Sequence, residues 1–294
     1  MRLFVTGASG WVGSALVPEL VDAGHHVLGL ARSDASADVV QRAGAEVVRG
    51  SLEDIHALRA GADKADGVIH LAFVHDFGRY DEGNALDRAA IAAMGDVLAG
   101  SDRPLIITSG MTARPDGRPA TEHDPPQPGI ARSEASTMTV ALADHGVRSA
   151  VVRLPPTVHG RGDQGFVKTL VDVARQRGVA AYVGDGANVW PAVHRADAAH
   201  LYRLVLDGAP AGSVWQAVAD EGVPTRQIAE AIGEHLGVGV ESIDAAAAAE
   251  HFGFVGFVFG LDIPASSAIT RERLGWQPTG PGLLDDLAAG HYFS

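Results

Sequence analysis

The sequence predicts an α/β fold, in which a parallel sheet is covered by helices on both faces. The first half of the chain alternates short apolar segments with segments of helical periodicity, an order typical of such sheets. The runs LIIT (105–108) and VVRL (151–154) suit strands that are buried on both sides. A glycine-rich stretch after the first apolar segment is typical of a nucleotide-binding turn.

The predicted elements follow one another at regular intervals. Strands are expected at residues 2–6, 26–31, 45–50, 67–72, 104–108 and 148–154, and helices at a stretch ending at Leu20 and at 35–42, 52–60, 84–98 and 133–146. A loop rich in proline, glycine and acids separates the last two of these helices, at residues 113–129.

The second half is less regular. It predicts helices at 166–177 and 244–252, strands near 181–183 and 213–217, and a helix after Pro224 with Thr225 as its candidate cap. We therefore expect a dinucleotide-binding domain over residues 1–175 and a mostly substrate-binding lobe over 176–294, with the chain returning to the sheet near 190–217.

Composition narrows the class of protein. The 294 residues carry 36 acids against 23 bases, a formal net charge of −13, which weighs against a nucleic-acid partner. The absence of cysteine excludes disulfides, thiolate nucleophiles and cysteine-based zinc sites. The longest apolar run, FVGFVFGL (254–261), is far shorter than the roughly 20 residues that cross a bilayer. We expect a soluble cytoplasmic protein with no membrane partner.

The glycine-rich turn is VTGASGWVGSAL (5–16), between the first strand and the first helix. Gly7 suits the tight turn, Gly10 suits the approach of a pyrophosphate, and Gly13 suits close packing of helix on strand. The free N–H groups at the start of a helix favour a phosphate. The expected fold is therefore a Rossmann doubly wound sheet that binds a dinucleotide.

The second strand ends in LARSD (30–34), where the ribose of the dinucleotide is expected. Arg32 offers a guanidinium fork and Ser33 a hydroxyl, which together suit the 2′-phosphate of NADP. Asp34 is the competing candidate, because an acid at this place would hold the ribose hydroxyls of NAD. We expect NADP.

An ordered set of motifs resembles the extended and atypical short-chain dehydrogenase/reductases, a superfamily that includes epimerases and dehydratases. TGASGWVG is similar to the TGxxGxxG turn of that superfamily, and RLPPTVHGRG (153–162) resembles its segment beside the nicotinamide. GSLED, HLAF, VGDG, WPAVHRADAA and LGWQP also resemble its motifs, so the resemblance spans nearly the whole chain. Together with the turn, it implies that the cofactor contacts Thr6, Gly7, Ser9, Gly10, Trp11, Val12, Gly13, Arg32, Ser33, Ser51, Leu52, Leu71, Ala72, Phe73, Thr108, Leu154, Pro155, Pro156 and His159.

The resemblance fails at the proton donor. Active members carry a Ser or Thr after the fifth strand and a Tyr-xxx-Lys pair, but no tyrosine here precedes a lysine by four residues. In the register we assign, Ile130 and Glu134 stand at the Tyr and Lys positions. Gly110 stands at the catalytic hydroxyl, which leaves Ser109 one residue early and Thr112 as a weaker substitute.

His75, Arg79 and Ser109 are the catalytic candidates. If residues 75–79 are helical, His75 and Arg79 share one face, where histidine donates a proton and arginine orients a carbonyl or phosphate group. A solvated surface loop is the alternative for this pair. Ser109 either orients a substrate oxygen or bonds local backbone. Neither a His-Glu-x-x-His pattern nor a tight histidine cluster indicates a metal.

Trp190 and His194 are the substrate-side candidates, with Trp190 as an apolar wall of a pocket together with Phe73. The expected function is an NADP-dependent oxidoreductase that reduces a small carbonyl, imine or activated alkene. A non-catalytic NADP-binding sensor or partner-binding protein is the alternative, and a sugar-nucleotide epimerase or dehydratase is the third. The small-residue helix 133–143 is a candidate surface for a homodimer.

Overall fold

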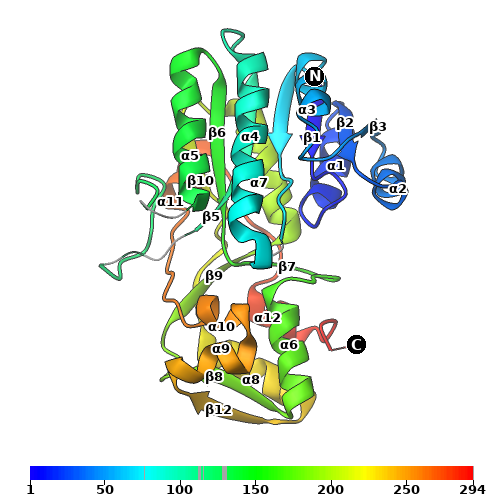
Figure 1. Cartoon of the computed structure of the whole chain (residues 1–294). Helices are drawn as coiled ribbons and strands as arrows, with labels where there is room; N and C mark the ends of the chain where they lie inside the picture. Colours follow the sequence, from blue (N-terminus) through cyan, green and yellow to red (C-terminus); the bar gives the residue numbers. More distant parts are fainter. Residues whose placement is uncertain (76, 112–113, 115, 128–130, 294) are drawn as a thin grey trace.

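The computed structural model describes residues 1–75, 77–111, 114, 116–127 and 131–293. Seven parallel strands form the main sheet in the order β10-β6-β5-β4-β1-β2-β3 (Figure 1). Their bounds are β1 Arg2–Thr6, β2 His26–Ala31, β3 Glu46–Arg49, β4 Gly67–His70, β5 Pro104–Gly110, β6 Arg148–Leu154 and β10 Ser213–Gln216. The predicted doubly wound α/β fold is confirmed.

Helices cover both faces of this sheet, because alternate strand residues point to opposite sides and both sides are apolar. One face, with Leu3, Val5 and Ile106, packs on α1 (Gly13–Asp22), α2 (Asp34–Arg42) and α7 (Arg195–Gly208). The other face, with Phe4, Leu105 and Ile107, packs on α3 (Ile55–Asp63), α4 (Tyr80–Leu98) and α5 (Ala131–Ala141).

A smaller lobe lies beyond the carboxyl ends of these strands, below the main sheet in Figure 1. Its three-stranded sheet is β11 (Asp220–Pro224), β9 (Val189–His194) and β7 (Thr157–His159), and its two-stranded sheet is β12 (Gly239–Ile243) and β8 (Val179–Val183). Its helices are α6 (Phe166–Arg177), α8 (Thr225–Leu236), α9 (Ala248–Phe252), α10 (Phe254–Phe259) and α12 (Leu283–Ala288).

Chain segments pass between the two parts more than once. β7 and β9 belong to the small lobe, whereas the preceding β6 and the later α7 and β10 belong to the main sheet and its cover. The last such segment is α11 (Ala268–Leu274), which precedes Trp276 in the core beside α7. The division of the chain at residues 175 and 176 stays a prediction.

Three expected details differ in the structure. The helix expected over 133–146 is α5 followed by a 3₁₀ turn at Leu142–His145, and α4 begins at Tyr80, four residues before the predicted start. Thr225 does not cap α8; it is the first helical residue, and its hydroxyl donates to Asn188 Oδ1 at 2.7 Å. Among the helices that the structure describes, none has the length and apolar character of a membrane span.

Candidate active site

The turn between β1 and α1 is built so tightly that two of its glycines admit no side chain. A Cβ on Gly7 would lie 2.7 Å from the backbone nitrogen of Ala72, and a Cβ on Gly13 would lie 2.1 Å from the Gly7 carbonyl oxygen. No side chain caps the start of α1, and a helix start without such a cap favours an anion, although the Ser14 and Ala15 N–H groups bond the Gly10 and Val12 carbonyls. These features fit the pyrophosphate of a dinucleotide.

The turn is joined directly to the segment after β4. The Thr6 hydroxyl bonds His70 Nδ1 at 2.7 Å and accepts from the Ala72 N–H at 3.3 Å. Leu71, Ala72 and Phe73 therefore start beside the turn, as their predicted cofactor role requires. Trp11 closes the other side, with its indole N–H donating to the Val158 carbonyl at 2.7 Å.

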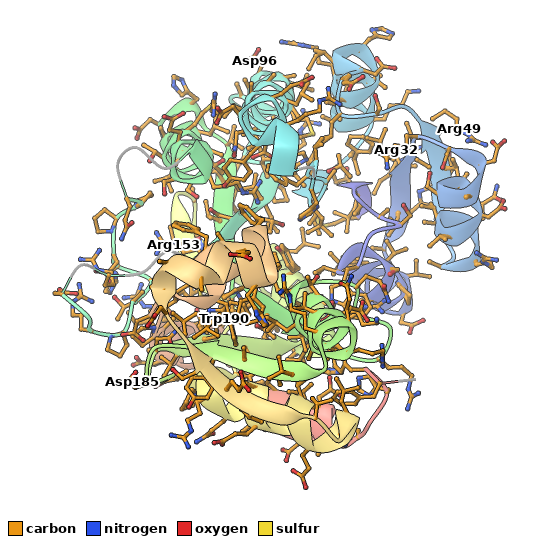
Figure 2. All side chains as sticks on the ribbon, turned by 60° about the horizontal axis from the view of Figure 1, so that its bottom comes forward. Arg32, Arg49, Asp96, Arg153, Asp185 and Trp190 are labelled. Atoms are coloured by element: carbon orange, nitrogen blue, oxygen red, sulfur yellow. The ribbon has the colours of Figure 1, made fainter. Side chains whose placement is uncertain are left out.

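The carboxyl ends of β2 and β3 carry two neighbouring arginines, Arg32 and Arg49 (Figure 2). Asp34 is occupied by Arg49, with 2.6 Å between Oδ1 and Nη2. Arg32 is exposed and makes no hydrogen bond or ion pair within the described ranges. The Ser33 hydroxyl caps α2 by accepting from the Ser36 N–H. Of the predicted residues that follow, Ser51 accepts from the Glu53 N–H and Leu52 packs against the core.

A continuous chain of polar contacts joins the carboxyl ends of β4 and β5 to the helices α4, α5 and α7. His70 Nε2 contacts Asp87 Oδ1 at 3.1 Å, and the other carboxylate oxygen of Asp87 accepts from Arg132 at 3.2 Å. Arg132 also donates to the Thr108 carbonyl at 3.2 Å, and the Thr108 hydroxyl bonds Tyr202 at 2.7 Å. His70 and Asp87 are buried, so a buried carboxylate is neutralised by a single arginine at the active-site edge.

Arg132 lies where a substrate or nicotinamide ring is expected. Its guanidinium carbon sits 4.0 Å from the centre of the Phe73 ring, a cation–π contact, and its side chain is 16% exposed. Two of its nitrogens are used by Asp87 and Thr108, and a guanidinium has five N–H donors in all. The remaining donors are available to an oxygen on the exposed side.

The register that we assigned to α5 stays a prediction, but it does not bring Glu134 to the site. Glu134 points outward, is exposed and pairs with Arg88 on α4 at 3.2 Å, and Ile130 lies outside the described residues. Arg132 and Ser136, one helical turn apart, face β5 instead. Burial of Ala135, Ser136 and Thr139 identifies the inner face of α5, on which position 132 also falls.

Ser109 is buried, and the Ser136 hydroxyl donates to its oxygen at 2.8 Å. It faces α5, whereas a Cβ added to Gly110 would meet nothing within 4 Å. Gly110, to which our register assigns the hydroxyl of the resembling proteins, carries no side chain, and none of the described residues would contact a Cβ there. Thr112, the weaker substitute, lies outside the described residues.

His75 and Arg79 do not share a helix face, because residues 71–75 are not helical and only the short 3₁₀ turn Phe77–Arg79 precedes α4. Arg79 Nε donates to Glu82 at 2.7 Å. His75 is exposed and its ring lies edge-on to Phe73. The protein around the ring lowers the pKa of His75, and the positive charge of Arg132 lowers it further. His75 therefore stays near the site, while Arg79 is engaged elsewhere.

The remaining predicted residues lie in the small lobe or in the segments that join it to the main sheet. Trp190 is fully buried in the core of the small lobe, and its indole N–H donates to the Val258 carbonyl. His159 is also fully buried, with Nδ1 2.9 Å from Asp286, and burial lowers its pKa. His194 caps α7 by accepting from the Ala196 N–H. Pro155 and Pro156 link β6 to β7 just after Leu154.

A glycine turn between the first strand and the first helix of a doubly wound sheet is typical of dinucleotide-binding proteins. The chain belongs to the NAD dependent epimerase/dehydratase family, whose sequence model matches residues 3–217. This membership supports a nicotinamide cofactor and an oxidoreductase or epimerase type of activity, and the predicted superfamily is confirmed.

The curated relatives extend over much or all of the chain. An uncharacterized protein of Schizosaccharomyces pombe is 49% identical over 100% of both chains. A 2-alkyl-3-oxoalkanoate reductase of Stenotrophomonas maltophilia is 29% identical over 78% of this chain and 73% of its own. A 4-hydroxy-2-methyl-3-oxo-4-farnesyl-3,4-dihydroquinoline-1-oxide ketoreductase of Stigmatella aurantiaca is 27% identical over 86% of this chain and 80% of its own.

Solved structures agree on the fold. A UDP-glucose 4-epimerase of Thermotoga maritima, crystallised with UDP-glucose, superposes with a TM-score of 0.79 over 100% of this chain and 98% of its own, at 19% identity.

Proposed function

We propose that this protein is an NADP-dependent reductase of a small carbonyl compound, in which Arg132 stabilises the substrate oxygen. The observation that carries the proposal is the guanidinium of Arg132, held by Asp87 and Phe73 at the end of β5, with N–H donors left over. The names of two relatives, a ketoreductase and an oxoalkanoate reductase, support a carbonyl substrate. A bound nicotinamide would supply the hydride.

The preference for NADP is supported by charge at the ends of β2 and β3. Arg32 has no partner within the described ranges, while Asp34, the residue that would favour NAD, is engaged by Arg49. A 2′-phosphate placed here meets the guanidinium of Arg32, and charge-assisted bonds of this kind are among the strongest in proteins. We infer that Arg32 binds the phosphate and that Arg49 keeps the Asp34 carboxylate paired beside it.

Arg132 acts as a fixed positive charge, because a guanidinium keeps its proton at any ordinary pH. As the carbonyl is reduced, negative charge grows on its oxygen, and a cation already in place lowers that barrier. Asp87 and Phe73 hold the cation, so little reorganisation is needed at the moment of reaction.

The proton on the product oxygen then comes from His75 or from water, since Arg132 does not release one. His75 is close enough to Phe73 and Arg132 for its pKa to respond to them. The Ser109 hydroxyl accepts from Ser136 at 2.8 Å and donates to the Arg132 carbonyl at 3.5 Å, so it helps to hold α5, and with it Arg132, beside β5. The apolar wall on this side is Phe73.

The test is consumption of NADPH with a panel of 3-oxo acids and their esters. We expect oxidation of NADPH that requires the 3-oxo compound. A protein that binds NADPH tightly but oxidises it with no member of the panel would favour the non-catalytic alternative. The homodimer and the cytoplasmic location stay predictions.

A further inference from the structure

Three polar side chains lie in one row across β5, β6 and the edge strand β10 of the main sheet. Ser109 on β5 pairs with Arg153 on β6, and Arg153 pairs with Gln216 on β10. The preceding row on the same face is Ile107, Val151 and Val214, which packs against the apolar core. The face that holds α5 therefore changes from apolar to polar at the carboxyl ends of these strands.

This row lines a small cavity that opens toward solvent between the strand ends and the start of α5. Ser133 and Ser136 of α5 contribute to its lining, and Arg114 and Asp124 contribute from the loop after β5. Figure 2 shows Arg153 well apart from Arg32 and Arg49, as the strand order requires. The cavity is thus separate from the adenine end of the site.

Gln216 is the unusual member of this lining. It is 0% exposed, yet neither its amide oxygen nor its amide nitrogen has a hydrogen-bond partner in the described structure. Buried amide groups are nearly always paired, because leaving one unpaired costs about 1–3 kcal/mol. Because the Gln216 amide is buried, unpaired and beside a cavity, we expect a molecule bound in the cavity to form the missing hydrogen bonds.

The charges around the cavity favour an anion as that molecule. The guanidinium of Arg153 is mostly buried, and among the described residues it donates to the backbone carbonyls of Thr121 and Asp124. Arg114 Nε has no hydrogen bond in the described structure, although it lies 3.9 Å from Asp116 Oδ1, and Arg114 Nη1 lies 3.6 Å from Asp124 Oδ1. The one carboxylate in the lining, Asp124, already accepts from Arg118 and from the Thr121 N–H and hydroxyl. Among the described lining residues, Arg153 is thus the guanidinium without a carboxylate partner, since Arg114 and Arg118 both pair with Asp124.

We infer that this cavity binds a carboxylate of the substrate, with Gln216, Arg153 and Ser133 as its donors. The inference adds a substrate class to the proposed function. It rests on that function, because the bound carboxylate is a substrate only if the protein is a reductase. The cavity admits a small group, which suits the acid end of an oxo acid whose carbonyl lies nearer Arg132. Ser109 and Ser136 lie on the same lining and connect the two positions.

Calorimetry with acetoacetate and with methyl acetoacetate tests the carboxylate subsite, in the presence of NADP⁺ so that no reduction occurs. We expect wild type to bind the acid about tenfold or more tightly than the ester. Gln216→Leu removes an unpaired amide, so it should fold at least as stably, and it should lose that preference. Ser149→Ala is the matched control, because this buried, unpaired hydroxyl lies at the opposite end of β6.

Equal binding of acid and ester by wild type would overturn the subsite, as would an unchanged preference in Gln216→Leu. The same ligands with NADPH separate this inference from the proposed function. Selective binding of acetoacetate without its reduction would uphold the subsite and contradict the reductase. Reduction of acid and ester with equal KM would uphold the reductase and contradict the subsite.

Discussion

The two ends of the cofactor site differ in how far they follow the family pattern. At the glycine turn, each residue type expected for a dinucleotide is present, and the backbone leaves no room for a substitute at Gly7 or Gly13. At the end of β5, by contrast, the hydroxyl position is Gly110 and the inner face of α5 carries Arg132 and Ser136. Binding a dinucleotide constrains backbone geometry, whereas the chemistry beside it depends on a few exchangeable side chains.

The contrast between the glycine turn and the end of β5 can be tested by substitution, and we expect the largest loss of stability and NADPH binding at Gly13. In Gly13→Ala the new methyl group would overlap the Gly7 carbonyl oxygen, which should cost about 3 kcal/mol of unfolding free energy and abolish NADPH binding. Urea unfolding and fluorescence titration measure the two effects. Gly208→Ala is the control, because a Cβ there meets nothing within 4 Å. Tight NADPH binding by Gly13→Ala would show that the turn is not the phosphate site.

The sequence predicts the glycine turn better than it predicts the site at the end of β5. The glycine turn and the strand before it are contiguous, so local spacing was enough to predict their fold and their ligand class. Arg132 was missed because its position depended on counting through residues 128–130 to a helix start that no cap marks in the sequence. Gln216 was missed because its row joins residues 109, 153 and 216, which only the strand order brings together.

The second largest effect is expected at Arg132. Arg132→Met should lower kcat by about 100- to 1,000-fold, as loss of an oxyanion-stabilising donor does, and leave NADPH affinity within a few-fold. Because the change also leaves Asp87 without its cation, Arg132→Lys serves as a second variant that keeps the charge. Steady-state kinetics with a reducible oxo compound measure both. Arg88→Met removes the arginine that pairs with the outer face of α5 and should retain activity.

If Arg132→Met kept wild-type kcat in a folded protein, the cation would be structural and the oxygen would be held elsewhere. A fall in kcat together with a similar loss of NADPH affinity would place Arg132 on the cofactor and not on the substrate.

A smaller effect is expected at the adenine end. Arg32→Ser should weaken NADPH binding by about tenfold or more while leaving NADH unchanged, because only NADPH carries the 2′-phosphate. Isothermal titration with both cofactors measures the ratio. Arg42→Ser, on the last turn of α2, is the matched control and should leave the ratio intact. Equal affinities of wild type for the two cofactors would contradict the assignment of NADP.

The smallest effect concerns pH and His75. Its lowered pKa leaves the ring mostly neutral at pH 7, and a proton donor must be protonated, so kcat should rise as the pH falls through the pKa of His75. In His75→Ala that rise should be absent, with kcat near pH 7 reduced only a few-fold because water also donates. The measurement is the pH profile of kcat for both proteins between pH 5 and 8, with His56→Ala on the exposed side of α3 as control. Identical profiles for wild type and His75→Ala would assign the proton to water, and the reaction end would then depend on Arg132 alone.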